Sequence, residues 1–142
     1  MKILFIAFFA FLFTPAIWLG NFTDAQKEAQ TAHKLILINF SGSDWCIPCM
    51  RLRKEILESN VFEDYAKDKL ILVRADFPRQ KKNQLSKEQV KLNENLADKY
   101  NKDGKFPFTL LVDENGKVVK TWEGFPDESP LEFVQVISNL SK

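Results

Sequence analysis

Two short, almost wholly apolar runs, separated by helical patterns, constrain the fold more than any other feature. The first covers residues 35–40 (LILINF) and the second covers residues 70–77 (LILVRADF). Runs this short and this apolar are typical of strands that are buried on both faces of a sheet. Because strands joined through a helix pair in parallel, the sequence predicts a parallel core that is covered by helices.

The C-terminal part of the chain adds an antiparallel pair. Residues 108–112 and 117–122 have strand patterns, and Asn115-Gly116 between them is a strong signal for a hairpin turn. A hairpin forces its two strands to run antiparallel. The predicted fold is therefore α/β, with one mixed β-sheet flanked by helices on both faces.

Helices are predicted where apolar residues recur at helical spacing or where capping residues mark a start. Thr23 and Ser86 each begin a capping-box sequence, and Ser129 with Pro130 begins another helix. The predicted helices span residues 23–33, 46–58, 61–67 and 86–100, followed by a last helix that begins near Ser129. The residues expected to face the core are Met50, Ile56 and Leu57 in the second helix, and Leu131, Val134, Ile137 and Leu140 in the last.

Composition excludes several functional classes. Lys and Arg total 20 and Asp and Glu total 19, so the net charge of +1 argues against a nucleic-acid-binding protein. Two Cys are too few for a disulfide-stapled miniprotein. Together with one His they are also too few for a four-ligand zinc site.

The N-terminus has the pattern of an export signal. Lys2 precedes an unbroken apolar run over residues 3–13, as in a secretory signal peptide. Thr14-Pro15-Ala16 offers a small-residue cleavage site, whereas cleavage after Gly20 would place bulky Trp18 at the minus-three position.

An uncleaved membrane anchor is the alternative. Residues 3–19 provide 17 residues, the short end of what crosses a bilayer, and Trp18 would lie at the interface. In both cases residues 1–20 are the leader or anchor, and residues 21–142 form an exported domain, periplasmic or secreted.

Cys46 and Cys49 lie where the first buried strand is followed by a helix. Their spacing places both thiols within one helical turn, close enough for a disulfide. Unpaired N–H groups and the helix dipole favour negative charge at a helix start, so we expect a stabilised thiolate at Cys46. Cys49 lies one turn deeper and is suited to resolving a mixed disulfide. Pro48 fits the first turn because it has no N–H to lose there.

Other interpretations of the two cysteines are weaker. A static structural disulfide gains little, because closing so short a loop removes little chain entropy. Half a metal site is disfavoured, since the single imidazole, His33, belongs to a preceding helix. Inert buried thiols do not suit an exported chain, which meets an oxidising environment. Trp45 before the pair and Pro48 within it favour a redox-active dithiol.

Trp45-Cys46-Ile47-Pro48-Cys49 resembles the active-site motif of the thioredoxin superfamily. Residues 105–110 (KFPFTL) are similar to the segment that holds the family's cis-proline, and Gly124 matches a family glycine. The resemblance covers about residues 35–140. The approach to the motif, residues 41–46, looks most like that of small exported thioredoxin-like proteins of bacteria.

The resemblance implies a thioredoxin-like fold with a cis peptide bond between Phe106 and Pro107, beside the two sulfurs. The exposed backbone at Phe106 would pair with an extended segment of the substrate, a form of strand addition. Trp45, Phe106, Pro107 and Gly124 are the substrate-binding residues implied in this way. Local sequence alone favours a trans proline at Pro107, at the start of an edge strand. For Trp45, simple packing in the fold is as good an interpretation as contact with the substrate.

The chain departs from the family pattern inside the predicted site. The family commonly carries a buried Asp on the first core strand, and Asn39 occupies the matching position. Because Asn39 cannot titrate, proton transfer at Cys49 needs water or another group, and we expect Asn39 to be a hydrogen-bonded buried amide. Arg74 stands where the family often has Lys, either within the site or as a solvated edge charge. Ile47-Pro48 replaces the usual Gly-Pro, which leaves the redox potential open.

These features predict an exported thiol–disulfide oxidoreductase, with reduction as the preferred direction. Cys46 attacks a substrate disulfide and Cys49 displaces the mixed disulfide. With no nicotinamide or flavin signature, the expected redox group is the Cys46–Cys49 pair, without cofactor or metal. The expected partners are protein thiols and disulfides and a membrane thiol carrier that donates electrons.

Two other functions remain open. A binding or chaperone-like module would use the same docking surface with the cysteines secondary. Copper handling through the two thiolates is weakened because Met50 is the one Met or His near Cys46. Residues 78–84 form a basic polar segment with Arg79, Lys81 and Lys82, which is typical of a solvated loop and otherwise suits an acidic partner.

Overall fold

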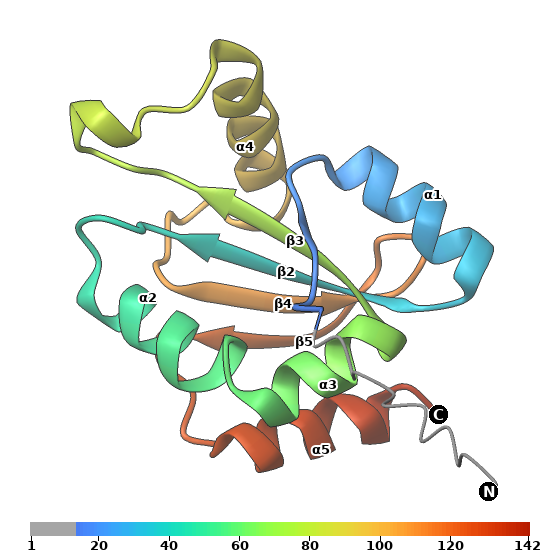
Figure 1. The fold of residues 1–142 in the computed structure, drawn as a ribbon. Coiled ribbons are helices and arrows are strands. Elements are labelled where there is room, and N and C mark those ends of the chain that lie inside the picture. The colour runs from blue at the N-terminus through green and yellow to red at the C-terminus, as the bar shows by residue number, and fades with distance from the viewer. Residues whose placement is uncertain (1–13) are drawn as a thin grey trace, which may run out of the picture.

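The computed structural model describes residues 14–142, in which a mixed sheet lies between two groups of helices (Figure 1). The sheet has five strands in the order β1-β3-β2-β4-β5. The strands are β1 (Trp18–Leu19), β2 (Leu35–Ser41), β3 (Leu70–Asp76), β4 (Phe108–Val112) and β5 (Val118–Glu123). The helices are α1 (Phe22–Ala32), α2 (Ile47–Leu52), α3 (Asn60–Lys69), α4 (Lys87–Tyr100) and α5 (Pro130–Leu140). A π-helical turn (Arg53–Leu57) continues α2, and a 3-10 turn (Lys81–Asn83) precedes α4.

The predicted mixed sheet is confirmed. β3 pairs in parallel with β2, and β4 pairs antiparallel with both β2 and β5. The turn at Asn115-Gly116 joins β4 to β5, and Gly116 has a φ of 83°. Glycine reaches this left-handed region without the steric cost that a Cβ would bring, so the local hairpin signal and the observed turn agree.

β1 lies within the segment that we assigned to a leader or anchor. Trp18 and Leu19 pair in parallel with Leu72 and Val73 of β3. An apolar strand and the end of an apolar leader share one pattern, which explains why the sequence did not reveal β1. The apolar run over residues 3–13 lies outside the described residues. Within residues 14–142, no helix has the length and apolar character needed to cross a membrane.

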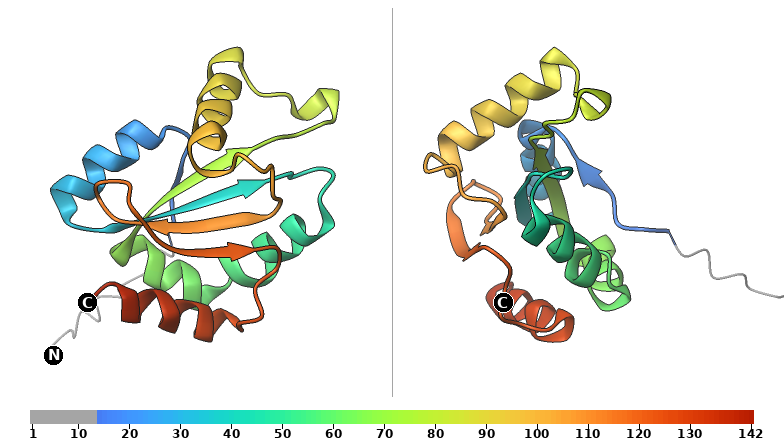
Figure 2. Two further views of the ribbon diagram at one scale, coloured as in Figure 1. Left: turned by 180° about the vertical axis from the view of Figure 1, so that it is seen from behind. Right: turned by 90° about the vertical axis from the view of Figure 1, so that its left-hand side faces the viewer.

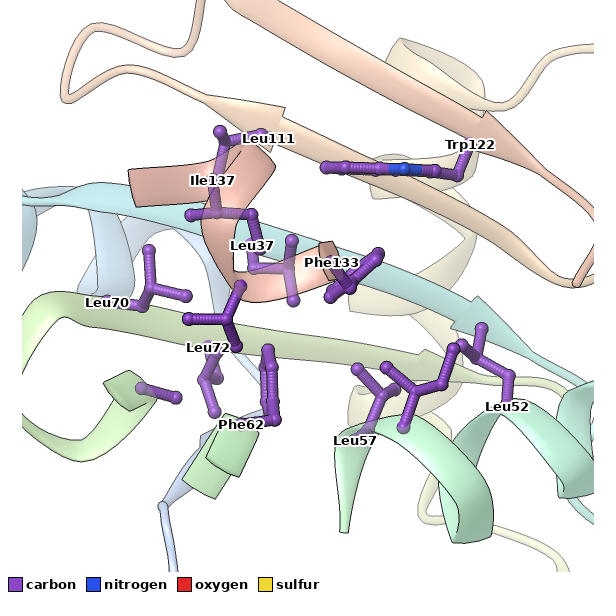
Figure 3. Packing of buried hydrophobic residues seen from close by; sticks show 13 residues of the cluster. Leu37, Leu52, Leu57, Phe62, Leu70, Leu72, Leu111, Trp122, Phe133 and Ile137 are labelled. Atoms are coloured by element: carbon purple, nitrogen blue, oxygen red, sulfur yellow. The ribbon is translucent and has the colours of Figure 1, made fainter. Parts of the chain in front are cut away.

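The helices cover both faces of the sheet (Figures 1 and 2). α1 and α4 lie on one face, and α2, α3 and α5 lie on the other. On the second face, Phe133 of α5 packs between Phe62 of α3 and Trp122 of β5, among the aliphatic side chains seen in Figure 3. Burial of this apolar surface is the main stabilising contribution to the fold.

Three residues that we expected in the core are instead exposed. Met50 is 37% exposed, Leu131 is 54% exposed and Leu140 is 39% exposed. Met50 follows the buried Cys49 and is therefore turned about 100° away from it around the helix axis. In α5 the buried stripe is Phe133, Val134 and Ile137, because the bulky Phe133 fills the space over the sheet.

The helix starts differ in part from expectation. Asn21, not Thr23, caps α1, since its Oδ1 accepts the N–H of Thr23 at 2.9 Å. At α4 the Ser86 side chain accepts the N–H of Gln89, but the return bond that would complete the box is not formed. Both halves of the capping box form at Ser129, as predicted for α5.

Candidate active site

The two cysteines lie where β2 leads into α2, and they form a disulfide with Cα atoms 5.2 Å apart. Cys46 is the N-cap of α2, one position before the first turn in which we expected it. Its Sγ accepts the backbone N–H of Cys49 at 3.3 Å. This N–H is one of the donors that a helix start leaves unpaired, so it would stabilise a thiolate at Cys46 in the reduced protein.

The sulfurs are almost covered, while the residues between them are not. Cys46 is 5% exposed, and Cys49 is the deeper of the two at 2%. The N–H of Gly42 donates to the Sγ of Cys49 at 3.5 Å. Ile47 is 66% exposed and Pro48 is also exposed, so an apolar dipeptide projects beside the disulfide.

The peptide bond between Phe106 and Pro107 is cis, as the resemblance implied. Pro107 leads directly into β4, whose first residue, Phe108, pairs with Phe40 near the end of β2. The cis-proline segment and the cysteines therefore lie at the same end of the sheet. The carbonyl of Pro107 accepts the N–H of Gly124, which has a φ of 75°, a conformation that favours glycine.

An aromatic cluster of Trp45, Phe77 and Phe106 borders the disulfide. The ring of Phe106 is 5.4 Å from that of Trp45 and 5.5 Å from that of Phe77, edge to face in both pairs. The indole N–H of Trp45 donates to the carbonyl of Phe77 at 2.7 Å. Phe77 was not among the expected site residues, although its place just after β3 puts it at this end of the sheet. That Trp45, Phe106, Pro107 and Gly124 bind substrate stays a prediction.

Asn39 and Arg74 are neighbours across β2 and β3. Asn39 is buried, and its amide donates to the hydroxyl of Thr109 at 3.1 Å, which confirms the expected hydrogen-bonded amide. The guanidinium of Arg74 lies 4.2 Å from the ring centre of Trp18. Burial lowers the pKa of Arg74. The residue is thus a partly buried cation stacked on β1, which is not the solvated edge charge that we considered.

A surface cavity of about 370 Å³ reaches Cys49 from the side of α2. It is lined by Ser41, Ser43, Cys49, Met50, Arg53, Lys54 and Glu58. A cavity of this size, with hydroxyl and charged side chains in its wall, has room for several water molecules. Because Asn39 cannot titrate, water in this cavity is suited to exchange a proton with the Cys49 thiol.

Two consecutive residues near Cys46 hold the end of β3 and the segment that follows it. Ser43 donates its N–H at 2.9 Å and its hydroxyl at 2.5 Å to the carboxylate of Asp76. The carboxylate of Asp44 accepts the N–H groups of Arg79 and Gln80, each at 2.9 Å. The N–H of Arg79, ahead of the other donors, holds the pKa of Asp44 below its ordinary value. No local pattern predicts these contacts, because the bonded residues are more than 30 positions apart in the sequence.

Across residues 14–142, no group of three or more His, Cys, Asp or Glu side chains is placed to hold a metal ion. The chemistry that the site offers through its own residues is thiol–disulfide exchange between Cys46, Cys49 and an external sulfur.

A Cys-x-x-Cys pair at the start of a helix, next to a cis-proline loop on a mixed sheet, defines the thioredoxin class of thiol–disulfide oxidoreductases. Residues 22–140 match the family model of the thioredoxin-like domain, and the chain belongs to this family. The comparison with individual proteins agrees with this assignment.

The chain is 35% identical over 122 residues to disulfide bond reductase DsbH of Chlamydia pneumoniae, covering 86% of this chain and 71% of that protein. It is 36% identical over 61 residues to thioredoxin-related protein DsbJ of the same organism, covering 43% of this chain and 18% of that one. A solved structure of a DsbH oxidoreductase superposes with a TM-score of 0.80 at 29% identity, covering 90% of this chain and 85% of the other. The fold is therefore thioredoxin-like, and the chain is a thiol–disulfide oxidoreductase.

Proposed function

We propose that this protein reduces disulfides of exported proteins, with Cys46 as the nucleophile and Cys49 as the resolving thiol. The observation that carries the chemistry is the N–H of Cys49 donating to Sγ of Cys46 at the start of α2. The direction is supported by the relative named as a disulfide bond reductase, which this chain matches over most of its length.

The proposed reaction is a two-electron exchange. The Cys46 thiolate attacks one sulfur of the substrate disulfide, and the other substrate sulfur leaves as a thiolate that takes up a proton. Cys49 then loses its proton and attacks Cys46, which releases the second substrate thiol. The products are a substrate dithiol and the Cys46–Cys49 disulfide, which a dithiol donor must reduce again. We assign that role to a membrane thiol carrier, with no cofactor besides the cysteine pair.

The hydrogen-bond environment of the Cys46 sulfur supports the reducing direction. Within residues 14–142, the hydrogen bond to its Sγ comes from a backbone N–H, and no cationic side chain donates to it. Strong stabilisation of the thiolate would favour the reduced form and make the pair an oxidant. A thiolate held by one neutral donor leaves the dithiol readily oxidised by its substrates.

The equilibrium potential of the pair tests the direction of electron flow. We expect a value near ~ −270 mV in glutathione redox buffers, as for reducing thioredoxins. Tryptophan fluorescence, or alkylation followed by mass analysis, would measure the reduced fraction, with a Cys46→Ser/Cys49→Ser variant as the blank. A value near ~ −120 mV would overturn the reductase assignment in favour of an oxidant.

The structure bears on where a leader peptidase would cut the chain. Trp18 pairs with β3 and stacks on Arg74, and the carbonyl of Gly20 accepts a hydrogen bond from Gln89 at 2.8 Å. Cleavage after Gly20 would remove β1 and expose the edge of β3. We therefore propose that export by a cleaved signal leaves Trp18 on the mature chain, with the cut after Ala16.

Intact-mass analysis of the protein recovered from the exported fraction of a bacterial host tests this proposal. The expected mature chain begins at Ile17, and an uncut chain would indicate the anchored form. A chain that begins at Asn21 would contradict the proposal. The stability of a variant truncated to that residue, compared with one truncated to Ile17, would then show whether β1 is dispensable.

A further inference from the structure

A basic loop, residues 78–84, borders the dithiol and is not used by the proposed chemistry. It contains Arg79, Lys81 and Lys82, all exposed, and no acidic residue. The connection between β3 and α4, which includes this loop, lies at the same end of the sheet as the connection between β2 and α2 (Figures 1 and 2). The loop therefore stands beside the cysteines.

The basic loop is fixed to the residues that precede Cys46. Beyond the two N–H bonds already described, Asp44 accepts the side-chain amide of Asn83 at 3.0 Å, and its carbonyl accepts that of Gln80 at 3.3 Å. The guanidinium of Arg79 lies 3.7 Å from the ring centre of Trp45. A substrate that reaches Trp45 therefore lies within a few ångströms of a positive charge.

The positive charge of the basic loop is only partly offset by its neighbours. Among residues 14–142, none of its cations has an ion-pair partner, whereas Arg51 and Arg53 beside the cysteines pair with Glu55 and Glu58 at 3.0 Å and 2.6 Å. Asp44 offsets part of the loop's charge, and a positive surplus remains. Because the whole chain carries a net charge of only +1, this surplus is a local feature of one side of the active site.

We propose that the basic loop selects protein substrates whose disulfide is flanked by acidic residues. The proposal rests on the proposed function, because it assigns a specificity to that same dithiol. Acidic side chains next to the substrate disulfide meet Arg79, Lys81 and Lys82 while the cysteine sulfur meets Cys46. Such local complementarity raises the rate of encounter and disfavours substrates that carry basic flanks.

An anionic membrane surface is the other partner that exposed cations would suit. A peptide is favoured because Arg79 stacks on Trp45, in the aromatic cluster that borders the disulfide, and not on a remote face. The experiment below separates the two.

Three peptides with the same internal disulfide, flanked by Glu, by Gln or by Lys, provide the test. The pre-reduced full chain, in neutral detergent, is mixed with each peptide, and tryptophan fluorescence, to which Trp45 beside the disulfide contributes, follows oxidation of the chain. At about 0.01 M salt we expect the Glu peptide to react roughly tenfold faster than the Lys peptide. At about 1 M salt, where the screening length is about 3 Å, the difference should disappear.

Matched charge reversals locate the effect. In the Lys81→Glu/Lys82→Glu variant, we expect the ratio of the Glu-peptide rate to the Lys-peptide rate to fall to about one or below. The control variant, Lys27→Glu/Lys117→Glu, carries the same charge change on α1 and at the hairpin, away from the cysteines. It should keep the ratio of the unaltered chain.

An Asp44→Ala variant tests whether the peptide preference requires Asp44 to hold the basic loop in place or depends only on the net charge near the cysteines. The substitution removes a negative charge, so a long-range effect alone would increase the preference for the Glu peptide. If Asp44 holds the cations in place, as its bonds to Arg79, Gln80 and Asn83 indicate, the preference should instead decrease. Using the ratio of two peptides cancels any change in the reactivity of Cys46 itself.

The outcomes are distinct. If the Gln peptide is not reduced by the unaltered chain, the proposed function fails. If it is reduced but the three peptides react at equal rates, or the loop variant keeps the preference, only the substrate inference is overturned. Vesicles containing phosphatidylglycerol are the remaining probe: if the loop reversal abolishes co-sedimentation with them and leaves the peptide ratio unchanged, the loop binds membranes and the inference is overturned.

Discussion

Replacing Cys46 by serine is expected to lower the rate of disulfide reduction by more than about 10³-fold, because it removes the attacking sulfur. A serine hydroxyl at the start of α2 is not ionised at neutral pH and does not attack a disulfide. The insulin precipitation assay, driven by a dithiol, measures the loss. Thermal unfolding of the variant provides the control that the fold is retained, since the reduced parent chain also lacks the disulfide.

Cys49→Ser provides the matched comparison. This variant keeps the nucleophile and loses only the resolving thiol, so we expect it to accumulate mixed disulfides that non-reducing gels and mass analysis reveal. If Cys46→Ser trapped partners and Cys49→Ser did not, the two roles would be reversed. If Cys46→Ser still bound an unfolded client as well as the parent chain did, the docking surface would act independently of the dithiol, as in a binding module.

The sequence predicts part of the active-site geometry on which the roles of Cys46 and Cys49 depend. The apolar runs and the Cys-x-x-Cys spacing predict a dithiol at a strand–helix junction because each signal is local. The cis bond before Pro107 came from the family resemblance, since local sequence favours trans. The contacts of Asp44 with Arg79 and of Trp45 with Phe77 join segments more than 30 residues apart, so they arise from the fold and carry no local pattern.

The limits of local sequence patterns also explain why some residues predicted to lie in the core are exposed. The i, i+3 series of Leu131, Val134 and Ile137 predicts one helix face, yet Phe133 next to it is also apolar. Periodicity alone does not decide between two overlapping stripes. The choice depends on the space above the sheet, which Phe62 and Trp122 define from other elements.

Replacing Phe133 by alanine is expected to lower the free energy of unfolding by about 3–5 kcal/mol. Phe133 is fully buried, and its ring centre lies 4.7 Å from that of Trp122 and 6.0 Å from that of Phe62 (Figure 3). Removing the ring leaves a cavity that rigid neighbours fill only in part. Urea unfolding of the oxidised chain, followed by circular dichroism, measures the change.

Leu131→Ala is the control, because the sequence pattern placed Leu131 in the core and the structure leaves it 54% exposed. We expect a change within about 0.5 kcal/mol for this variant. A large loss for Leu131→Ala with a small loss for Phe133→Ala would mean that α5 packs on the face that periodicity indicated. Since small domains have a total stability of about 5–15 kcal/mol, the loss at Phe133 would be a large share of it.

Phe133 packs on β5 just before the turn at Gly124, so its loss should also loosen that end of the active site. A fall in peptide reduction by Phe133→Ala at temperatures below unfolding would show this coupling.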